Sequence, residues 1–282
     1  MTTLHVDVGG TRTKYAAPLH SAQVIDTPDS WQPALQQVVT LTRQHNCTEL
    51  ALALPGLIDP AQKVWITSTA LGANQVDLDQ WFRDRHINLQ VVSNDVAAAA
   101  TGEAKGATLA LLQIGTGIGS RYVAAGTVVT GHSNLAGEIG HLVIDPAGPL
   151  CRCGKRGCLE ATSGWNAIQG QLLSIQPDLT PHPAQLIDPN ADTAVKELSN
   201  RVFHALGQAS AALVTLADPG ELRLGGGLAT AWSTTGAHRI KEAMAAFAHP
   251  EVVANTRVTL STLADNAALE GLALLAARSS SP

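Results

Sequence analysis

Two stretches of the chain share one pattern, a short apolar strand that enters a glycine turn and continues at once as a second strand. The first stretch is TLHVDV, 3–8, then Gly9-Gly10-Thr11, then a strand at about 13–18. The second is TLALLQI, 108–114, then GTGIG, 115–119, then two further strands. Glycines let a phosphate approach the backbone, and successive N–H groups can form an anion-binding nest. The repetition predicts a duplicated architecture with a nucleotide held between its halves.

The first turn has an alternative interpretation. It fits a plain tight hairpin equally well, because glycine turns are common between paired strands. Neither the Walker A pattern nor the G-x-G-x-x-G fingerprint is present at this turn, and no helix follows it. A third glycine run, Gly225-Gly226-Gly227, lies after a predicted strand at 221–224 and again allows close approach of a ligand to the backbone.

Strand and helix patterns divide the rest of the chain. Further strands are predicted at 49–54, 63–66, 87–95 and 257–260. Helices are predicted at 32–45, 78–85, 96–106, 164–175, 193–216, 237–247 and 267–277. A polar, proline-containing loop is expected at 176–192, and the last residues, SSSP, are expected to be disordered.

Composition and charge exclude several classes of function. The 282 residues suffice for one large or two modest domains, and their net charge of −5 argues against nucleic acid as the main partner. Apolar runs stay shorter than 18 residues, so no membrane span is expected. The start, MTTLHVDVGG, lacks the charged and apolar regions of a signal peptide, which predicts a cytoplasmic protein with reduced thiols.

A histidine and three cysteines cluster in a glycine-rich segment. They are His141, Cys151, Cys153 and Cys158, and the chain has only four cysteines in all. Thiolate and imidazole are the ligands that Zn²⁺ prefers, and four of them complete a closed structural site. The alternative is three unrelated thiols. The spacing predicts a zinc-binding loop.

Carboxylates stand beside the cluster and at one strand end. Glu138 and Glu160 bracket the loop, and ionised oxygens accept strong hydrogen bonds from sugar hydroxyls. Two solvated surface glutamates explain the spacing equally well. Asp95 follows the strand that ends SND, where α/β folds place catalytic groups and where a general base would fit. A helix N-cap is the structural alternative for Asp95.

Together these motifs resemble the ROK family of sugar kinases over nearly the whole chain. DVGGTRTK, SNDVAAAATGE, IGTGIG, LAGEIGH followed by CRCGKRGCLE, LGGGLA and DNAALEGLALLA carry the resemblance. It implies an actin-like ATPase (ribonuclease H-like) fold, with two α/β lobes, an active-site cleft between them and a structural zinc loop. The smaller lobe would be 1–112 plus 265–282, and the larger lobe 113–264 with the zinc loop at 141–158.

The resemblance also implies roles for single residues. Asp95 would be the general base for the 6-hydroxyl of the sugar. The sugar would be bound by Gly56, Asn94, Asp95, Glu138, His141 and Glu160. ATP, accompanied by Mg²⁺, would meet Gly9, Gly10, Thr11, Lys14, Thr116, Gly117, Gly226 and Gly227. Zn²⁺ would be held by His141, Cys151, Cys153 and Cys158, with the second ring nitrogen of His141 facing the sugar. A homodimer is also implied.

The chain departs from the family at two points. Ser120-Arg121 stands where the family continues its second phosphate motif with glycines, and Arg121 either lies outside the cleft or alters a phosphate contact. The proline-asparagine pair that the family often shows after PGLID is absent, which leaves the sugar open.

Three functions are compatible with the resemblance. An ATP-dependent kinase of hexoses or N-acylhexosamines is favoured, with N-acetylmannosamine as the expected substrate, glucose as the alternative and polyphosphate as a more remote phosphoryl donor. A DNA-binding regulator is disfavoured because the first phosphate motif begins at Asp7. A non-catalytic sugar-binding protein is disfavoured because it would need neither Asp95 nor the glycine turns.

Overall fold

The computed structural model describes residues 2–18 and 20–279. Its residues separate into two compact units. The first comprises the chain up to Lys105, Thr130–Leu135 and the residues from Asn266 onward, and the second comprises Gly106–Val129 and Ala136–Asp265. The predicted disorder of SSSP lies outside the described residues, except that Ser279 ends the last helix.

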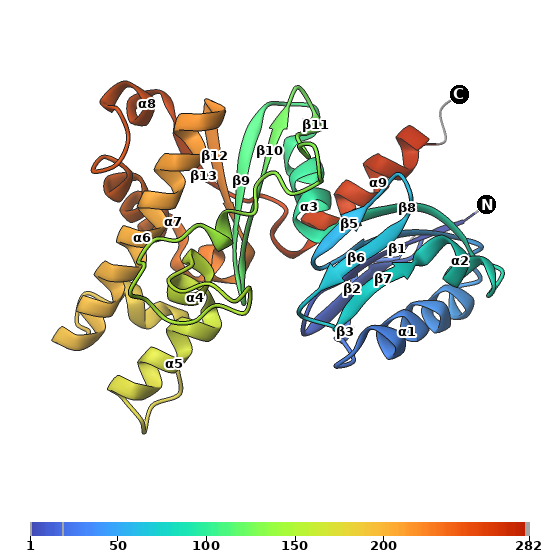
Figure 1. Cartoon of the computed structure of the whole chain (residues 1–282), viewed down its shortest axis with the longest axis horizontal. Helices are drawn as coiled ribbons and strands as arrows, with labels where there is room; N and C mark the ends of the chain where they lie inside the picture. Colours follow the sequence, from blue (N-terminus) through green and yellow to red (C-terminus); the bar gives the residue numbers. More distant parts are fainter. Residues whose placement is uncertain (1, 19, 280–282) are drawn as a thin grey trace. The chain divides into compact units, whose positions relative to one another are not determined.

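The first unit is built on a five-stranded sheet in the order β3-β2-β1-β4-β8 (Figure 1). The strands are β1 Thr3–Val8, β2 Arg12–Ala16, β3 Gln23–Asp26, β4 Glu49–Leu54 and β8 Asn88–Asn94. β1 pairs antiparallel with β2 and parallel with β4. A small sheet, β5 Leu57–Asp59, β6 Val64–Ser68 and β7 Ala73–Asp77, and helix α2, Leu78–Arg83, complete this part.

Buried and partly buried side chains alternate along β1, so the two faces of this sheet are covered by different helices. Leu4, Val6 and Val8 are fully buried in one core with residues of α1, Trp31–Gln44. α9, Ala267–Ser279, lies on the other face and packs on α3, Asp95–Ala104 (Figure 1). A methyl carbon at Gly271 would lie 1.8 Å from the carbonyl oxygen of Ala98, so only glycine permits this close helix contact.

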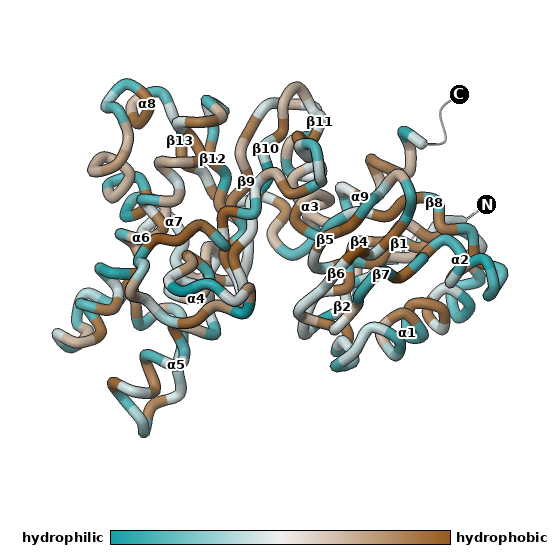
Figure 2. The backbone as a smooth tube through the Cα atoms, viewed as in Figure 1, coloured by the Kyte–Doolittle hydropathy of each residue, from teal (hydrophilic) through white to brown (hydrophobic). Residues whose placement is uncertain are grey.

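The second unit repeats this topology. Its sheet has the order β11-β10-β9-β12-β13, with β9 antiparallel to β10 and parallel to β12. The strands are β9 Leu109–Ile114, β10 Ile118–Ala124, β11 Thr127–Val128, β12 Glu221–Gly225 and β13 Arg257–Leu260. Figure 2 shows apolar residues concentrated along β9 and β12. The duplication predicted from the two strand–turn–strand stretches is therefore confirmed at the level of strand order and direction.

Helices surround the second sheet and contribute most of its core. They are α4 Leu159–Ser163, α5 Trp165–Ile175, α6 Thr193–Ala217, α7 Gly226–Met244 and α8 Pro250–Asn255, with short 3-10 helices at Ile139–His141, Pro183–Ile187 and, outside this unit in part, Ala264–Asn266. α6 and α7 bury Leu206, Phe203 and Trp232 against one another. Among the described helices, none is long and apolar enough to cross a membrane.

The structure corrects the predicted elements at several places. α7 begins at Gly226, eleven residues before the predicted helix, and its course is interrupted at Ser233, which has φ 54° and ψ −150°. Glycine and threonine give this segment weak helix propensity, which hid it. Strands β3, β5 and β7 and helices α4 and α8 were not predicted, and the expected loop at 176–192 contains the 3-10 helix Pro183–Ile187.

Candidate functional site

In the first unit, the turn between β1 and β2 is a tight hairpin that requires glycine. The N–H of Gly9 donates to the carbonyl oxygen of Arg12 at 2.9 Å, and a methyl carbon at Gly9 would lie 2.7 Å from that same oxygen. Gly10 and Thr11 are exposed at the tip, and Lys14 lies opposite Asp7 in the strand register. The four residues predicted to meet phosphates here are thus brought together in one hairpin.

Asp95 is held in a network at the carboxyl end of β8. Its Oδ1 accepts hydrogen bonds from the Val96 N–H at 2.8 Å and from Asn94 Nδ2 at 2.9 Å. The N-cap of α3 is Asn94, whose Oδ1 accepts from the Ala97 N–H at 3.0 Å. The alternative role of N-cap considered for Asp95 therefore belongs to Asn94, and Asp95 is the first helical residue.

Asn94 also connects this network to the turn after β4. Its Nδ2 donates to the carbonyl oxygen of Gly56 at 3.0 Å. Gly56 has φ +97°, and a methyl carbon there would lie 2.3 Å from the carbonyl oxygen of Thr67. Only glycine fits, so the turn is fixed against the small sheet. The first unit thus brings together Gly56, Asn94 and Asp95, the three residues of this unit that the sequence proposes for sugar binding.

In the second unit, the glycine turn between β9 and β10 packs directly on Glu160. The N–H of Ile118 donates to Glu160 Oε2 at 3.1 Å, and a methyl carbon at Gly117 would lie 2.4 Å from that oxygen. Glu160 is the second residue of α4 and comes two residues after Cys158, the last cysteine of the loop. Within the turn, the Gly115 N–H donates to the Gly117 carbonyl oxygen at 2.9 Å.

The third glycine run lies beside the second. Gly226 has φ +86°, and a methyl carbon there would lie 2.5 Å from the carbonyl oxygen of Ile114, the last residue of β9. A methyl carbon at Gly227 would meet no atom within 4 Å. The turns that contain Thr116-Gly117 and Gly226-Gly227 therefore meet at the same edge of the second sheet.

Arg121, the residue that departs from the family pattern, is buried and pairs with Glu138. Its Nη2 donates to Glu138 Oε1 at 2.9 Å, and its Nη1 donates to the carbonyl oxygen of Ser120 at 2.8 Å. The Arg121 side chain is 4% exposed and that of Glu138 is 40% exposed. Sequence reasoning missed this pair, and its only signal was an arginine in place of glycine.

The predicted metal ligands converge. One donor atom from each of His141, Cys151, Cys153 and Cys158 lies within 4.8 Å of every other. Cys153 and Cys158 Sγ are 3.6 Å apart, and Cys151 Sγ is 3.6 Å from His141 Nδ1. A tetrahedral zinc with ordinary bond lengths separates two sulfurs by about 3.8 Å, and a sulfur from a nitrogen by about 3.6 Å. The donor set therefore fits Zn²⁺ in chemistry and in size.

Glycine and burial shape the metal loop. Gly157 has φ +71°, and a methyl carbon there would lie 1.5 Å from the carbonyl oxygen of Asp145. Burial raises the pKa of the Cys158 thiol to about 12. A hydrogen bond from the Lys155 backbone lowers the pKa of the Cys153 thiol. A metal would have to displace the thiol protons, as metal binding to cysteine generally does.

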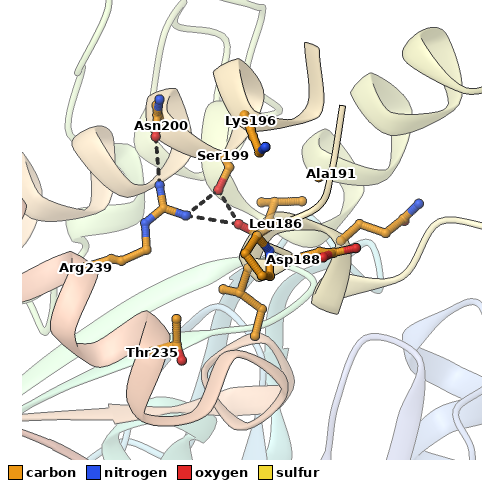
Figure 3. Close-up of a pocket in the computed structure, with 11 residues that line it drawn as sticks. Leu186, Asp188, Ala191, Lys196, Ser199, Asn200, Thr235 and Arg239 are labelled. Atoms are coloured by element: carbon orange, nitrogen blue, oxygen red, sulfur yellow. Dashed lines mark hydrogen bonds between the residues drawn. The ribbon is translucent and has the colours of Figure 1, made fainter. Parts of the chain in front are cut away.

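Two cavities in the second unit are lined by residues other than those predicted for the site. One, of about 170 Å³, lies among Pro183–Ile187, α6 and α7 (Figure 3). Arg239 fills its polar wall by donating to the Leu186 carbonyl oxygen, Ser199 Oγ and Asn200 Oδ1. The other, of about 640 Å³, lies beside α5 and α6 and is also lined by Ile144, Asp145 and Pro149 of the predicted zinc loop and by Ala161, which follows Glu160. No predicted site residue lines either cavity.

Known proteins resemble this chain in sequence and in fold. N-acetylmannosamine kinase of Escherichia fergusonii is 31% identical over 192 residues, which are 61% of this chain and 66% of that protein. Glucokinase of Halalkalibacterium halodurans is 28% identical over 304 residues, covering 94% of this chain and 92% of that protein. The crystal structure of a ROK hexokinase from Thermus thermophilus has a TM-score of 0.78 at 25% identity, covering 99% of this chain and 98% of that one.

These likenesses bear on the fold expected from the sequence. The mixed α/β structure and its similarity to ROK proteins confirm the actin-like ATPase fold class. The model of the ROK family matches residues 3–279, which is nearly the whole length. Given the glycine turns, the Cys/His loop and this match, the chain belongs to the ROK family.

Proposed function

We propose that this protein is an ATP-dependent kinase that phosphorylates the 6-hydroxyl of a hexose or an N-acetylhexosamine. The observation that carries the proposal is the fixed Asp95 carboxylate at the carboxyl end of β8, where two donors hold Oδ1. Relatives named as sugar kinases support the same reading. A carboxylate oriented in this way suits a general base, because proton transfer depends first on geometry.

The proposal assigns a role to each group. Asp95 accepts the proton of the attacking hydroxyl. Asn94 and the Gly56 turn of the first unit, and Glu138, His141 and Glu160 of the second, bind the remaining sugar hydroxyls. Carboxylate oxygens accept from sugar O–H donors, and charge makes these bonds stronger.

The glycine turns are assigned to ATP. The backbones of these turns and Lys14 orient the phosphates, with Gly9, Gly10 and Thr11 in the first unit and Thr116, Gly117, Gly226 and Gly227 in the second. Because the Gly9 N–H is used within the hairpin, Gly9 contributes by shaping the turn. Phosphoryl transfer needs positioning and charge neutralisation more than covalent help, and Mg²⁺ supplies part of that neutralisation when it is bound with ATP.

We also propose that His141, Cys151, Cys153 and Cys158 bind a structural Zn²⁺. The donor distances given above support this proposal. Such an ion would fix the ring of His141 and leave Nε2 to the sugar, because ligation at Nδ1 determines the tautomer and the ring orientation. A cytoplasmic homodimer is part of the same proposal and rests on the family resemblance alone.

N-acetylmannosamine is the substrate that we propose, because the relative that shows the higher identity carries that name. Glucose is the alternative, and a specific observation favours it: the glucokinase match extends over 94% of the chain. A substrate panel decides between them. Higher turnover on N-acetylmannosamine than on glucose supports the proposal, and the reverse ranking supports the alternative.

ADP release in the presence of sugar and Mg-ATP tests the kinase activity. We expect Asp95→Asn to lower kcat by about 10² to 10⁴, as for loss of a general base, with the sugar KM nearly unchanged. The matched control is Asp77→Asn, because Asp77 caps α2 from an exposed position and asparagine caps equally well. A wild-type protein without sugar-dependent ADP release on any hexose or aminosugar would falsify the kinase proposal. Full activity of Asp95→Asn would refute only the role of Asp95 as general base.

A further inference from the structure

Arg121 is an unusual residue for the place that it occupies. It lies in the middle of β10, between Ser120 and Tyr122, and the whole residue is 3% exposed. Burying a guanidinium group is costly unless it is paired and hydrogen-bonded. Among the described residues, it donates to the Ser120 carbonyl oxygen and to the Glu138 carboxylate. The strand therefore carries a charge whose burial depends on Glu138.

The turn before Glu138 is built to meet this arginine. The Ser120 N–H and Ser120 Oγ both donate to the carbonyl oxygen of Gly137, at 3.1 Å and 2.9 Å. Gly137 has φ +92°, and a methyl carbon there would lie 2.4 Å from the Ser120 carbonyl oxygen and 3.3 Å from Arg121 Nη1. β10 thus fixes the Glu138 backbone through Ser120 and the Glu138 side chain through Arg121.

The pair leaves one carboxylate oxygen available. Oε1 of Glu138 is bonded to Arg121, whereas Oε2 makes no hydrogen bond to any residue that the structure describes. The arginine is enclosed and the glutamate side chain is 40% exposed, so the carboxylate lies between the buried cation and solvent. A carboxylate oxygen in this position can accept a hydrogen bond from a ligand hydroxyl.

We propose that Arg121 is a positioning residue that holds Glu138 so that Oε2 accepts a hydroxyl of the sugar. This inference rests on the proposed kinase function and on the sugar-binding role of Glu138 within it. This role accounts for the departure of Arg121 from the family pattern. Arg121 does not contact phosphate, and it acts through the carboxylate of Glu138 that binds the sugar. Its effect is confined to sugar binding, and ATP binding does not depend on it.

Arg121→Met tests the inference, because methionine fills much of the volume without a charge. We expect the sugar KM to rise by about 10- to 100-fold, as for a group displaced by about 1 Å, while the KM for ATP changes less than about twofold. Arg121→Lys keeps the charge and loses the planar fork, so it should recover part of the sugar affinity. The matched control is Arg201→Met, an exposed arginine of α6, which should leave both KM values unchanged.

A double-mutant cycle shows whether Arg121 acts through Glu138. If it does, Arg121→Met combined with Glu138→Gln raises the sugar KM no more than Glu138→Gln alone, within about twofold. Multiplicative effects of the two substitutions, or a wild-type sugar KM in Arg121→Met, overturn the inference. Zinc content and thermal unfolding of each variant show whether the fold persists, and Arg121→Lys decides the question if Arg121→Met does not fold.

The outcome separates this inference from the proposed function. A wild-type protein that phosphorylates a sugar while Arg121→Met keeps its sugar KM refutes only the role of Arg121. A wild-type protein that phosphorylates no sugar refutes both.

Discussion

Gly117→Ala tests whether the second glycine turn holds Glu160. The added methyl carbon would lie 2.4 Å from Glu160 Oε2, whereas such carbons essentially never approach a heavy atom within 3.0 Å. The carboxylate must therefore retreat by at least ~0.6 Å from a position where it accepts the Ile118 N–H at 3.1 Å. A hydrogen bond to a charged group contributes about 1.5–3 kcal/mol, and Glu160 is only half-buried, so we expect a loss of about 1–2 kcal/mol of unfolding free energy.

Urea unfolding measures the loss of stability, and initial rates measure the sugar KM. The stability loss follows from the local geometry alone. The sugar KM changes only if Glu160 binds the sugar. In that case we expect the sugar KM to rise by about tenfold or more. A variant with lower stability and an unchanged sugar KM would therefore remove Glu160 from the proposed site and leave the geometry intact.

Gly115→Ala is the matched control in the same turn. Its methyl carbon would have only one neighbour, the Gly117 carbonyl oxygen at 4.0 Å, and Gly115 does not have a positive φ. Replacing glycine by alanine at such a position is neutral or stabilises by about 0.4–1 kcal/mol. If Gly115→Ala and Gly117→Ala have equal unfolding free energies, the steric reasoning is wrong.

Two further predictions concern the metal loop and α7. Cys153→Ser should lose both bound zinc, measured by elemental analysis, and sugar affinity. Cys47→Ser, at a buried cysteine outside the loop, should keep both. Full sugar affinity in a zinc-free protein would contradict the link between the loop and the site. Ser233→Gly should raise the unfolding free energy by about 1 kcal/mol, because φ 54° with ψ −150° is nearly exclusive to glycine. Ser174→Gly, in the last turn of α5 where φ is helical, should instead lower it by about 0.5 kcal/mol, and equal effects of the two would rule out strain at Ser233.

The repeated sheets were predictable because their signal is local. β1 and β9 each run into a glycine turn, and the antiparallel partner follows within a few residues. Short hairpins leave their pairing little freedom, so strand and turn can be recognised together. The edge strand β3 and the small sheet of β5, β6 and β7 have no such signal, because their short segments form strands only through tertiary pairing.

The convergence of the four candidate metal ligands was predictable for a similar reason. His141 and the three cysteines fall within one short segment, and few residue types bind zinc, so type and spacing sufficed. α7 shows the opposite case. Its first half contains glycine and threonine, and its helical course depends on packing of Trp232 against Phe203 of α6, which no local pattern records.

Contacts that orient the predicted site residues were the hardest to foresee. Asp95, Glu138 and Glu160 were all predicted by residue type, yet the donors that hold them are the Val96 N–H, Arg121 and the Ile118 N–H. A backbone N–H has no sequence signature. Arg121 is 17 residues from Glu138, and the two meet at a turn in which Gly137 has a positive φ and bonds to Ser120.

These three carboxylates share one physical property. In each, a protein donor bonds one oxygen, so the orientation of the carboxylate is fixed before any ligand arrives. Ordering a flexible glutamate on binding costs about 0.5–1.5 kcal/mol per side chain, and a carboxylate that is already held avoids that cost. Each hydrogen bond from a neutral sugar hydroxyl contributes only a modest net free energy. The cost of ordering a flexible side chain on binding would cancel much of that contribution. The donors behind the carboxylates are therefore as important to the proposed sugar affinity as the carboxylates themselves.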